Sequence, residues 1–230
     1  MMRRMLLSAV LLSILGALFT VTWLLVQEDS PLFRPIQQYE LVSEIQHVKP
    51  VEIDAVMQRY LGRSFWEVEL ETIQSELTRL DWVSSALVKR SWPAQLYVSI
   101  QEQKPVARWE QAGLVNQAGV VFYPNDLDGF DNLVVLEGQL ADSAKILVRL
   151  SMFQRALKLI GFRISALSLE LDGIWKVSLL DGSKIILNMT DDDLKLDQFV
   201  RAYPKLSMAL RKSPQVYDLR YSNGFIVGEI

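Results

Sequence analysis

A run of 22 uncharged residues near the N-terminus, Met5–Val26, limits the folds open to this chain more than any other feature. Because an α-helix rises about 1.5 Å per residue, a helix of this length crosses the ~30 Å hydrocarbon core of a bilayer. Two arginines precede the run and two acidic residues follow it. Positive charge favours the cytoplasmic side, so the sequence predicts a cytoplasmic tail over residues 1–4, a transmembrane helix over 5–26 and an external part over 27–230.

A cleaved signal peptide is the alternative explanation for the same run. The apolar core of a signal peptide is normally about 7–15 residues long and ends at a small-x-small cleavage site. The run here is longer, and its best match to such a site, Thr20-Val21-Thr22, is poor. We therefore expect a retained anchor. No later segment is apolar over a comparable length, which predicts a single-pass protein.

The composition of the external part excludes several kinds of chemistry. It contains 22 basic and 27 acidic residues, and this net charge of −5 argues against nucleic acid as a partner, because phosphates require a basic surface. The sequence has no cysteine, which excludes disulfides, zinc–thiolate sites and thiol nucleophiles. The single histidine, His47, lies in a polar segment and is expected to be a solvated loop residue rather than a catalytic or metal-binding group.

The first module of the external part is predicted to be α+β. Residues 36–46 are expected to form a strand, and apolar residues recur at the spacing of one helix face over 51–61 and over 68–80. Two strands are expected next, over 83–91 and 95–103, and apolar and polar residues alternate in the second. The order strand, helix, helix, strand, strand predicts two helices packed on one sheet.

The second module is predicted to be mostly β-sheet with flanking helices. Helical spacing recurs over 143–160 and over 191–211, with an interruption at Pro204. Asp-Gly pairs, which favour tight hairpin turns, separate three central strands and predict a β-meander. A closing hairpin is expected around Ser222-Asn223-Gly224. The expected strands are 114–115, 120–123, 164–171, 175–180, 184–189, 216–221 and 225–230.

Two acidic groups are candidates for a metal or catalytic site. Asp191–Asp193 follow Thr190 at the start of a predicted helix, where threonine caps free N–H groups and acids interact favourably with the helix dipole. The glutamates of 67–71 lie at the start of another predicted helix. An anchored cell-wall hydrolase would need two carboxylates in one sugar-sized cleft, which nothing in the sequence predicts. We expect helix capping in both groups, and no catalytic, metal or cofactor site, no small-molecule substrate and no enzymatic activity.

Four features, taken in order along the chain, resemble a known family. A strand with basic residues, Val88–Ser91, leads into Trp92-Pro93 and, after an alternating strand, into Pro105-Val106-Ala107-Arg108-Trp109. The segment Leu114–Phe122 follows, and Tyr217-Asp218-Leu219-Arg220-Tyr221 precedes Asn223-Gly224 near the end of the sequence. Together with the N-terminal apolar run, these features resemble the bacterial cell-division family FtsQ/DivIB over essentially the whole chain.

This resemblance implies both an architecture and a function. The architecture is a polypeptide-transport-associated (POTRA) domain over 36–105, followed by a mixed, mostly antiparallel β domain with flanking helices over 106–230. The function is a non-enzymatic scaffold of the division complex, anchored in the cell inner membrane with its C-terminal domain in the periplasm at the division septum. The implied partners are FtsB and FtsL, with other division proteins binding through the POTRA domain. The alternative is a POTRA-containing accessory factor for protein transport or envelope assembly.

The closing hairpin is the candidate binding site, because an unpaired sheet edge accepts a strand from a partner. Residues 225–227 are expected to pair through their backbone, Tyr221 to serve as an aromatic anchor and Arg220 to pair with an acidic residue. Asn223 and Gly224 are expected to set the turn, since both favour positive φ. The alternative is that these are ordinary core and turn residues. The predicted site comprises Arg220, Tyr221, Asn223, Gly224, Phe225, Ile226 and Val227.

A second surface is predicted on the membrane-proximal module. Its candidate residues are three basic side chains, Lys89, Arg90 and Arg108. The resemblance implies that other division proteins bind near these residues. The alternative is that the three side chains are solvated charges on amphipathic strands.

Overall fold

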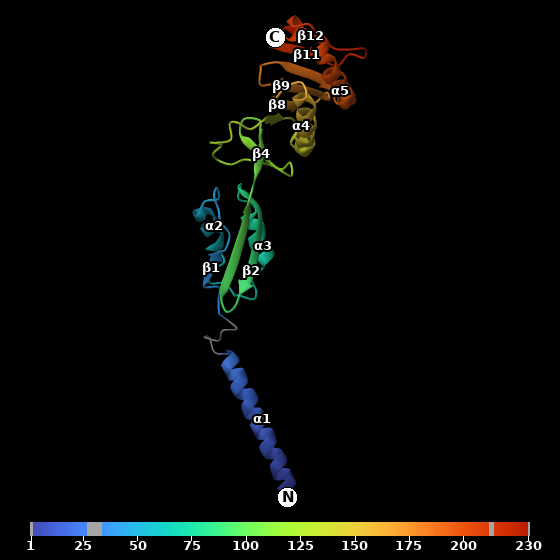
Figure 1. Ribbon diagram of the computed structural model, residues 1–230. Helices are drawn as coiled ribbons and strands as arrows, with labels where there is room; N and C mark the ends of the chain where they lie inside the picture. The colour runs from blue at the N-terminus through green and yellow to red at the C-terminus, as the bar shows by residue number, and fades with distance from the viewer. Residues whose placement is uncertain (1, 27–33, 212–213, 230) are drawn as a thin grey trace. The chain divides into compact units, whose positions relative to one another are not determined.

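The computed structural model describes residues 2–26, 34–211 and 214–229 (Figure 1). Helix α1 is continuous over Met2–Val26, so the predicted 5–26 segment is helical. In the part of the chain that the structure describes, no helix was found that combines the length and the apolar character needed to cross a membrane. The first residue of the predicted tail, the acidic residues after the apolar run and Ile230 of the last predicted strand lie outside the described residues. The chain divides into two compact units, Met1–Gln103 and Lys104–Ile230.

From residue 34 onward, the first unit contains a three-stranded sheet and two short helices. Along the chain the elements are β1 (Gln38–Leu41), α2 (Pro50–Met57), α3 (Leu70–Leu77), β2 (Val83–Ser91) and β3 (Gln95–Glu102). The strand order in space is β1-β3-β2, with β1 parallel to β3 and β2 antiparallel to it. The order of these elements along the chain confirms the predicted succession of strand, helix, helix, strand, strand.

Both helices are shorter than the sequence predicts. After α2 the N–H of Tyr60 bonds the carbonyl of Met57 at 2.9 Å, three residues back, so the chain tightens into turns before Gly62. Gly62 then has a φ of 81°, which only glycine adopts without strain. The apolar faces nevertheless lie inward as predicted. The core of this unit includes Ile53, Val56 and Met57 of α2, Ile73 and Leu77 of α3, and Leu96, Val98 and Ile100 of β3.

The second unit contains a nine-stranded mixed sheet. Its strand order is β12-β11-β10-β9-β8-β7-β4-β5-β6. Consecutive strands β8, β9 and β10 are antiparallel, which confirms the predicted meander, whereas β10–β11, β4–β7 and β7–β8 are parallel pairs. The strands are β4 (Pro105–Trp109), β5 (Gly113–Asn116), β6 (Val121–Phe122), β7 (Val135–Glu137), β8 (Ile164–Leu169), β9 (Ile174–Leu179), β10 (Lys184–Asn188), β11 (Gln215–Asp218) and β12 (Ile226–Glu229).

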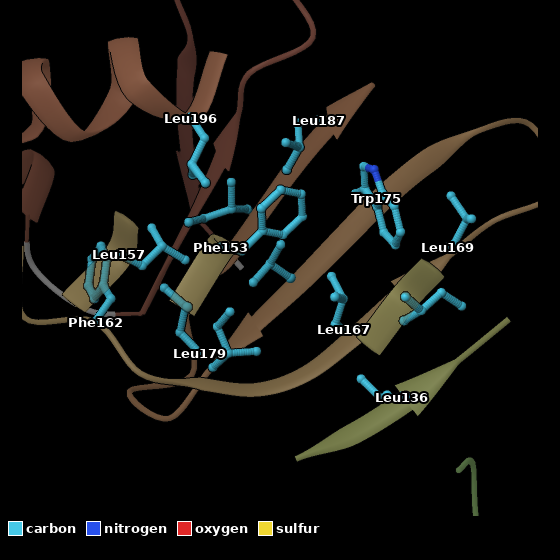
Figure 2. Packing of buried hydrophobic residues seen from close by; sticks show 14 of the residues in the cluster. Leu136, Phe153, Leu157, Phe162, Leu167, Leu169, Trp175, Leu179, Leu187 and Leu196 are labelled. Atoms are coloured by element: carbon cyan, nitrogen blue, oxygen red, sulfur yellow. The ribbon is translucent and has the colours of Figure 1, made fainter. Parts of the chain in front are cut away.

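Helices α4 (Ser143–Lys158) and α5 (Asp192–Ala202) pack on the same face of this sheet. Trp175 of β9 contacts both helices. Its ring meets Phe153 of α4 edge-to-face at 5.7 Å (Figure 2). Its indole N–H donates to Asp192 of α5 at 2.9 Å. The predicted interruption at Pro204 is confirmed, since α5 ends at Ala202. The short 3-10 helices are η1 (Leu140–Asp142), η2 (Tyr203–Lys205) and η3 (Ala209–Arg211).

A carboxylate at the end of β3 anchors the loop before α2. Glu102 Oε1 accepts bonds from the backbone N–H groups of Gln46, His47 and Val48 at 2.9, 2.8 and 2.8 Å. Its Oε2 lies 3.2 Å from His47 Nδ1, and the His47 ring stacks on Trp82 with 4.1 Å between centroids. His47 is exposed and lies in a loop, as predicted, and Glu102 and Trp82 contact its backbone and its ring.

The Glu102 cluster predicts how the first unit responds to pH. Burial acts to raise the pKa of Glu102, but the three N–H donors and His47 outweigh burial, so its pKa lies below the ordinary value. A carboxylate with a lowered folded pKa stabilises the fold above the unfolded pKa of about 4.3 and loses that effect as pH falls through the folded pKa. We expect Glu102→Gln to lower stability at pH 7 by about 1–3 kcal/mol and to flatten the stability loss between about pH 5 and 3.

Urea unfolding at several pH values, monitored by hydrogen exchange of peptides from the first unit, measures the stability of this unit and its pH dependence. Glu44 is an exposed carboxylate in the same loop, so Glu44→Gln is the matched control and is expected to leave the pH profile unchanged. An unchanged profile for Glu102→Gln would show that the cluster does not govern the acid response.

Candidate protein–protein interface

Strand β12 is an outer strand of the nine-stranded sheet (Figure 1). It pairs antiparallel with β11, in the register Gln215–Glu229, Val216–Gly228, Tyr217–Val227 and Asp218–Ile226. In the described part of the chain it has no pairing partner on its other side. Its second edge is therefore open to a strand from outside the chain.

The hydrogen bonds of β11 identify which β12 residues face that open edge. The N–H of Leu219 bonds the Ile186 carbonyl of β10 at 2.7 Å, and the N–H of Gln215 bonds Ser183 Oγ at 3.1 Å. Odd-numbered residues of β11 thus direct their backbone groups toward β10. Even-numbered ones, Val216 and Asp218, direct theirs toward β12.

It follows that Ile226 and Gly228, opposite Asp218 and Val216, use their backbone groups to pair with β11. The backbone groups of Val227 and Glu229 then lie on the open edge. The sequence predicts backbone pairing with a partner for residues 225–227. Of these, Ile226 and Val227 lie in β12, and in this register the amide of Val227 faces the open edge.

The side chains of this segment alternate between core and solvent. Phe225 and Val227 pack against the core of the second unit, and the Phe225 ring meets Phe199 of α5 edge-to-face at 5.2 Å. Ile226 is 50% exposed, on the opposite face. An incoming strand would therefore find outward amides at 227 and 229 and an apolar side chain at 226.

The connection between β11 and β12 is longer than the predicted tight hairpin. The strands end at Asp218 and resume at Ile226, so residues 219–225 form a loop rather than a three-residue turn. Gly224 has a φ of 155°, as expected for glycine. The expectation of positive φ at Asn223 is wrong, because Glu110 is the only non-glycine residue with positive φ in the described part of the chain.

Arg220 and Tyr221 both lie in this loop. The Arg220 guanidinium donates two bonds to the Asp218 carboxylate, at 2.9 and 2.6 Å, and this pairing holds the pKa of Asp218 below its usual range despite partial burial. Tyr221 is 50% exposed. Arg220 is therefore already paired in the unbound chain, whereas the Tyr221 side chain is accessible to a partner.

The residues of the predicted second surface have different environments. Arg90 donates bonds to the carbonyls of Phe65, Trp66 and Val68 at 2.8, 3.3 and 2.5 Å, and so holds the segment before α3. Arg108 belongs to the second unit and pairs with Asp131 at 3.1 Å. Lys89 lies exposed on β2.

The predicted side-chain caps are absent, although acidic residues do lie in the first turns of both helices, Glu71 in α3 and Asp192 and Asp193 in α5, where the helix dipole favours them. Neither α3 nor α5 has a side-chain hydrogen bond at its N-cap. Asp192 is 2% exposed, accepts a bond from the Trp175 indole at 2.9 Å and lies 3.3 Å from Arg149, which also pairs with Asp193 at 2.8 Å. Burial raises the pKa of Asp192, against the effect of Arg149. No group of side chains suited to a metal was found among the described residues.

Lys195 of α5 is a buried residue near the interface that was not among the predicted site residues. Its ammonium donates bonds to the carbonyls of Tyr221 and Ser222 at 2.5 and 2.9 Å. The buried residues of α5 are Asp192, Lys195, Leu196 and Phe199, at the spacing i, i+3, i+4, i+7. That spacing is the available sequence signal, because it places both charged residues on the apolar face.

Comparison with known proteins identifies the family. Residues 35–103 match the POTRA domain of FtsQ type, and residues 107–220 match the C-terminal region of the cell-division protein FtsQ/DivIB. The chain belongs to the FtsQ/DivIB family. FtsQ of Allochromatium vinosum is 31% identical over 97% of this chain and 88% of its own length. FtsQ of Coxiella burnetii is 30% identical, over 86% of this chain and 82% of its own. FtsQ of Haemophilus influenzae is 29% identical, over 96% and 88%.

Proposed function

We propose that this chain is a non-enzymatic scaffold of the bacterial division complex, which binds FtsB- and FtsL-type partners by strand addition to β12. Membership of a non-catalytic cell-division family supports the general role. The observation that carries the binding mode is the open edge of β12, with the amides of Val227 and Glu229 directed outward.

In the proposed complex, a partner strand pairs with that edge through its backbone, and the side chains of the partner strand determine the specificity of binding. Each backbone hydrogen bond contributes only about 0.5–1.5 kcal/mol net, so a strand as short as β12 needs side-chain contacts as well. Tyr221 and Ile226, each 50% exposed, supply aromatic and aliphatic surface. Arg220 would bind an acidic side chain of the partner by sharing or exchanging its bond to Asp218.

We also propose that residues 5–26 anchor the chain in the inner membrane, with residues 1–4 in the cytoplasm and the remainder in the periplasm at the septum. The support is the uncharged sequence, the arginines before it and the helical conformation of Met2–Val26. Within this proposal, residues 36–105 form the POTRA domain and 106–230 the β domain. Other division proteins bind the POTRA domain, where Lys89 is the exposed basic candidate.

The test begins with the full-length chain, which should be recovered from the inner-membrane fraction. Calorimetric titration in detergent with the extracytoplasmic segments of FtsB and FtsL is expected to show binding. Tyr221→Ala is expected to weaken that binding at least about tenfold, because truncating an aromatic anchor costs about 2 kcal/mol or more. Tyr123, another exposed tyrosine of the second unit, provides the matched control Tyr123→Ala. Absence of binding by the folded wild-type chain would overturn the proposed function.

A further inference from the structure

The loop that leads into β12 is held at its centre by one buried lysine. Lys195 is 6% exposed, and its ammonium donates to two successive carbonyls of the loop, those of Tyr221 and Ser222. Within the described residues no carboxylate lies within ion-pair distance of this ammonium. The two loop carbonyls are therefore the groups that compensate its burial.

Helix α5, which carries Lys195, contacts the core one turn before this residue and one turn after it. One turn before it, Asp192 accepts a hydrogen bond from the Trp175 indole and forms an ion pair with Arg149. One turn after it, the Phe199 ring lies 5.0 Å from Tyr217 of β11 and 5.2 Å from Phe225. The helix thus contacts β11 and both the middle and the end of the β11–β12 connection.

The chemistry of a buried lysine indicates what this contact does. Burying an ammonium costs free energy unless its donors are used, so an apolar residue would fill the same space with less penalty. What an apolar residue cannot do is bond loop carbonyls. Residues 219–225 include Ser222, Asn223 and Gly224, a composition that favours many backbone conformations when nothing restrains it.

We propose that Lys195 is a positioning residue for partner binding, which holds the 219–225 loop so that Tyr221 and the open edge of β12 are arranged before the partner arrives. This inference rests on the proposed function, because it concerns the same edge. A loop ordered in advance loses less conformational entropy on binding, and this raises affinity without any contact between Lys195 and the partner.

The test uses the full-length chain and the FtsB and FtsL extracytoplasmic segments as the probe, at a temperature where circular dichroism shows every variant to be folded. Lys195→Met is expected to weaken binding about tenfold or more, and Lys195→Arg to restore most of the affinity. Hydrogen exchange of the loop amides in the unbound chain is expected to speed up in Lys195→Met. Arg201→Met removes an exposed charge from the same helix and is expected to change neither property.

If Lys195→Met does not fold, Lys195→Leu replaces it, because a leucine side chain likewise has no donor for the loop carbonyls. The inference is overturned if a folded variant without the ammonium keeps wild-type affinity and wild-type loop exchange while Val227→Pro loses binding. The proposed function fails instead if the wild type does not bind, and strand addition to β12 fails if a folded Val227→Pro variant binds as the wild type does.

Discussion

The Val227→Pro variant of the full-length chain is expected to stay folded and to bind the FtsB and FtsL segments at least about tenfold more weakly. The backbone amide of Val227 faces the open edge of β12, because Asp218 and Val216 pair with its two neighbours. Proline removes that N–H and places a ring against an incoming strand. Proline is tolerated in edge strands when the lost N–H faces solvent, so the pairing with β11 remains.

Two further substitutions test whether the effect depends on the direction in which the backbone amide points. Val227→Thr keeps the N–H and the branched shape, and is expected to bind nearly as the wild type does. Gly228→Pro removes an amide that faces β11, and is expected to destabilise the second unit by loss of a sheet hydrogen bond. Calorimetry reports the affinities and thermal unfolding the stabilities. Wild-type affinity in a folded Val227→Pro variant would place the partner elsewhere.

The elements that sequence predicts well are those with strong local periodicity. The β8–β10 meander follows from alternating residues and Asp-Gly turns, and α4 from its apolar stripe. Strands β4 and β7 were not expected as strands. Strand β7 has only three residues and pairs in parallel with β4 and β8, so its position depends on partners distant in the sequence.

The candidate site was predictable in place but not in detail. The last strand is at the sheet edge, as the sequence suggested, but its outward amides depend on the pairing of β11 with β10, which no local pattern encodes. The loop conformation was missed for the same reason. Lys195 and Phe199 hold it from α5, so the Asn-Gly pair does not act alone as a tight turn.

Phe199→Ala is expected to destabilise the second unit by about 3–5 kcal/mol, the usual cost of removing a fully buried phenylalanine ring. Phe199 is completely buried, and its ring meets those of Tyr203, Tyr217 and Phe225 at 5.6, 5.0 and 5.2 Å. Tyr203 directly follows α5, Tyr217 lies in β11, and Phe225 directly precedes β12. A cavity at Phe199 therefore removes contacts from the helix and from both ends of the candidate interface, and the surrounding rings are too rigid to fill it.

Urea unfolding followed by hydrogen exchange of peptides from each unit separates the effect on the second unit from any effect on the first. The first unit has its own core cluster, which includes the buried ring of Phe65. Phe65→Ala is therefore the reciprocal control, expected to shift the exchange of the first unit and to spare the second. A loss below about 1 kcal/mol in Phe199→Ala would mean that the neighbouring aromatic residues collapse into the space, contrary to the packing described. A loss of the expected size, with the first unit unchanged, would show that the fold behind β12 is stabilised by the α5 aromatic contacts.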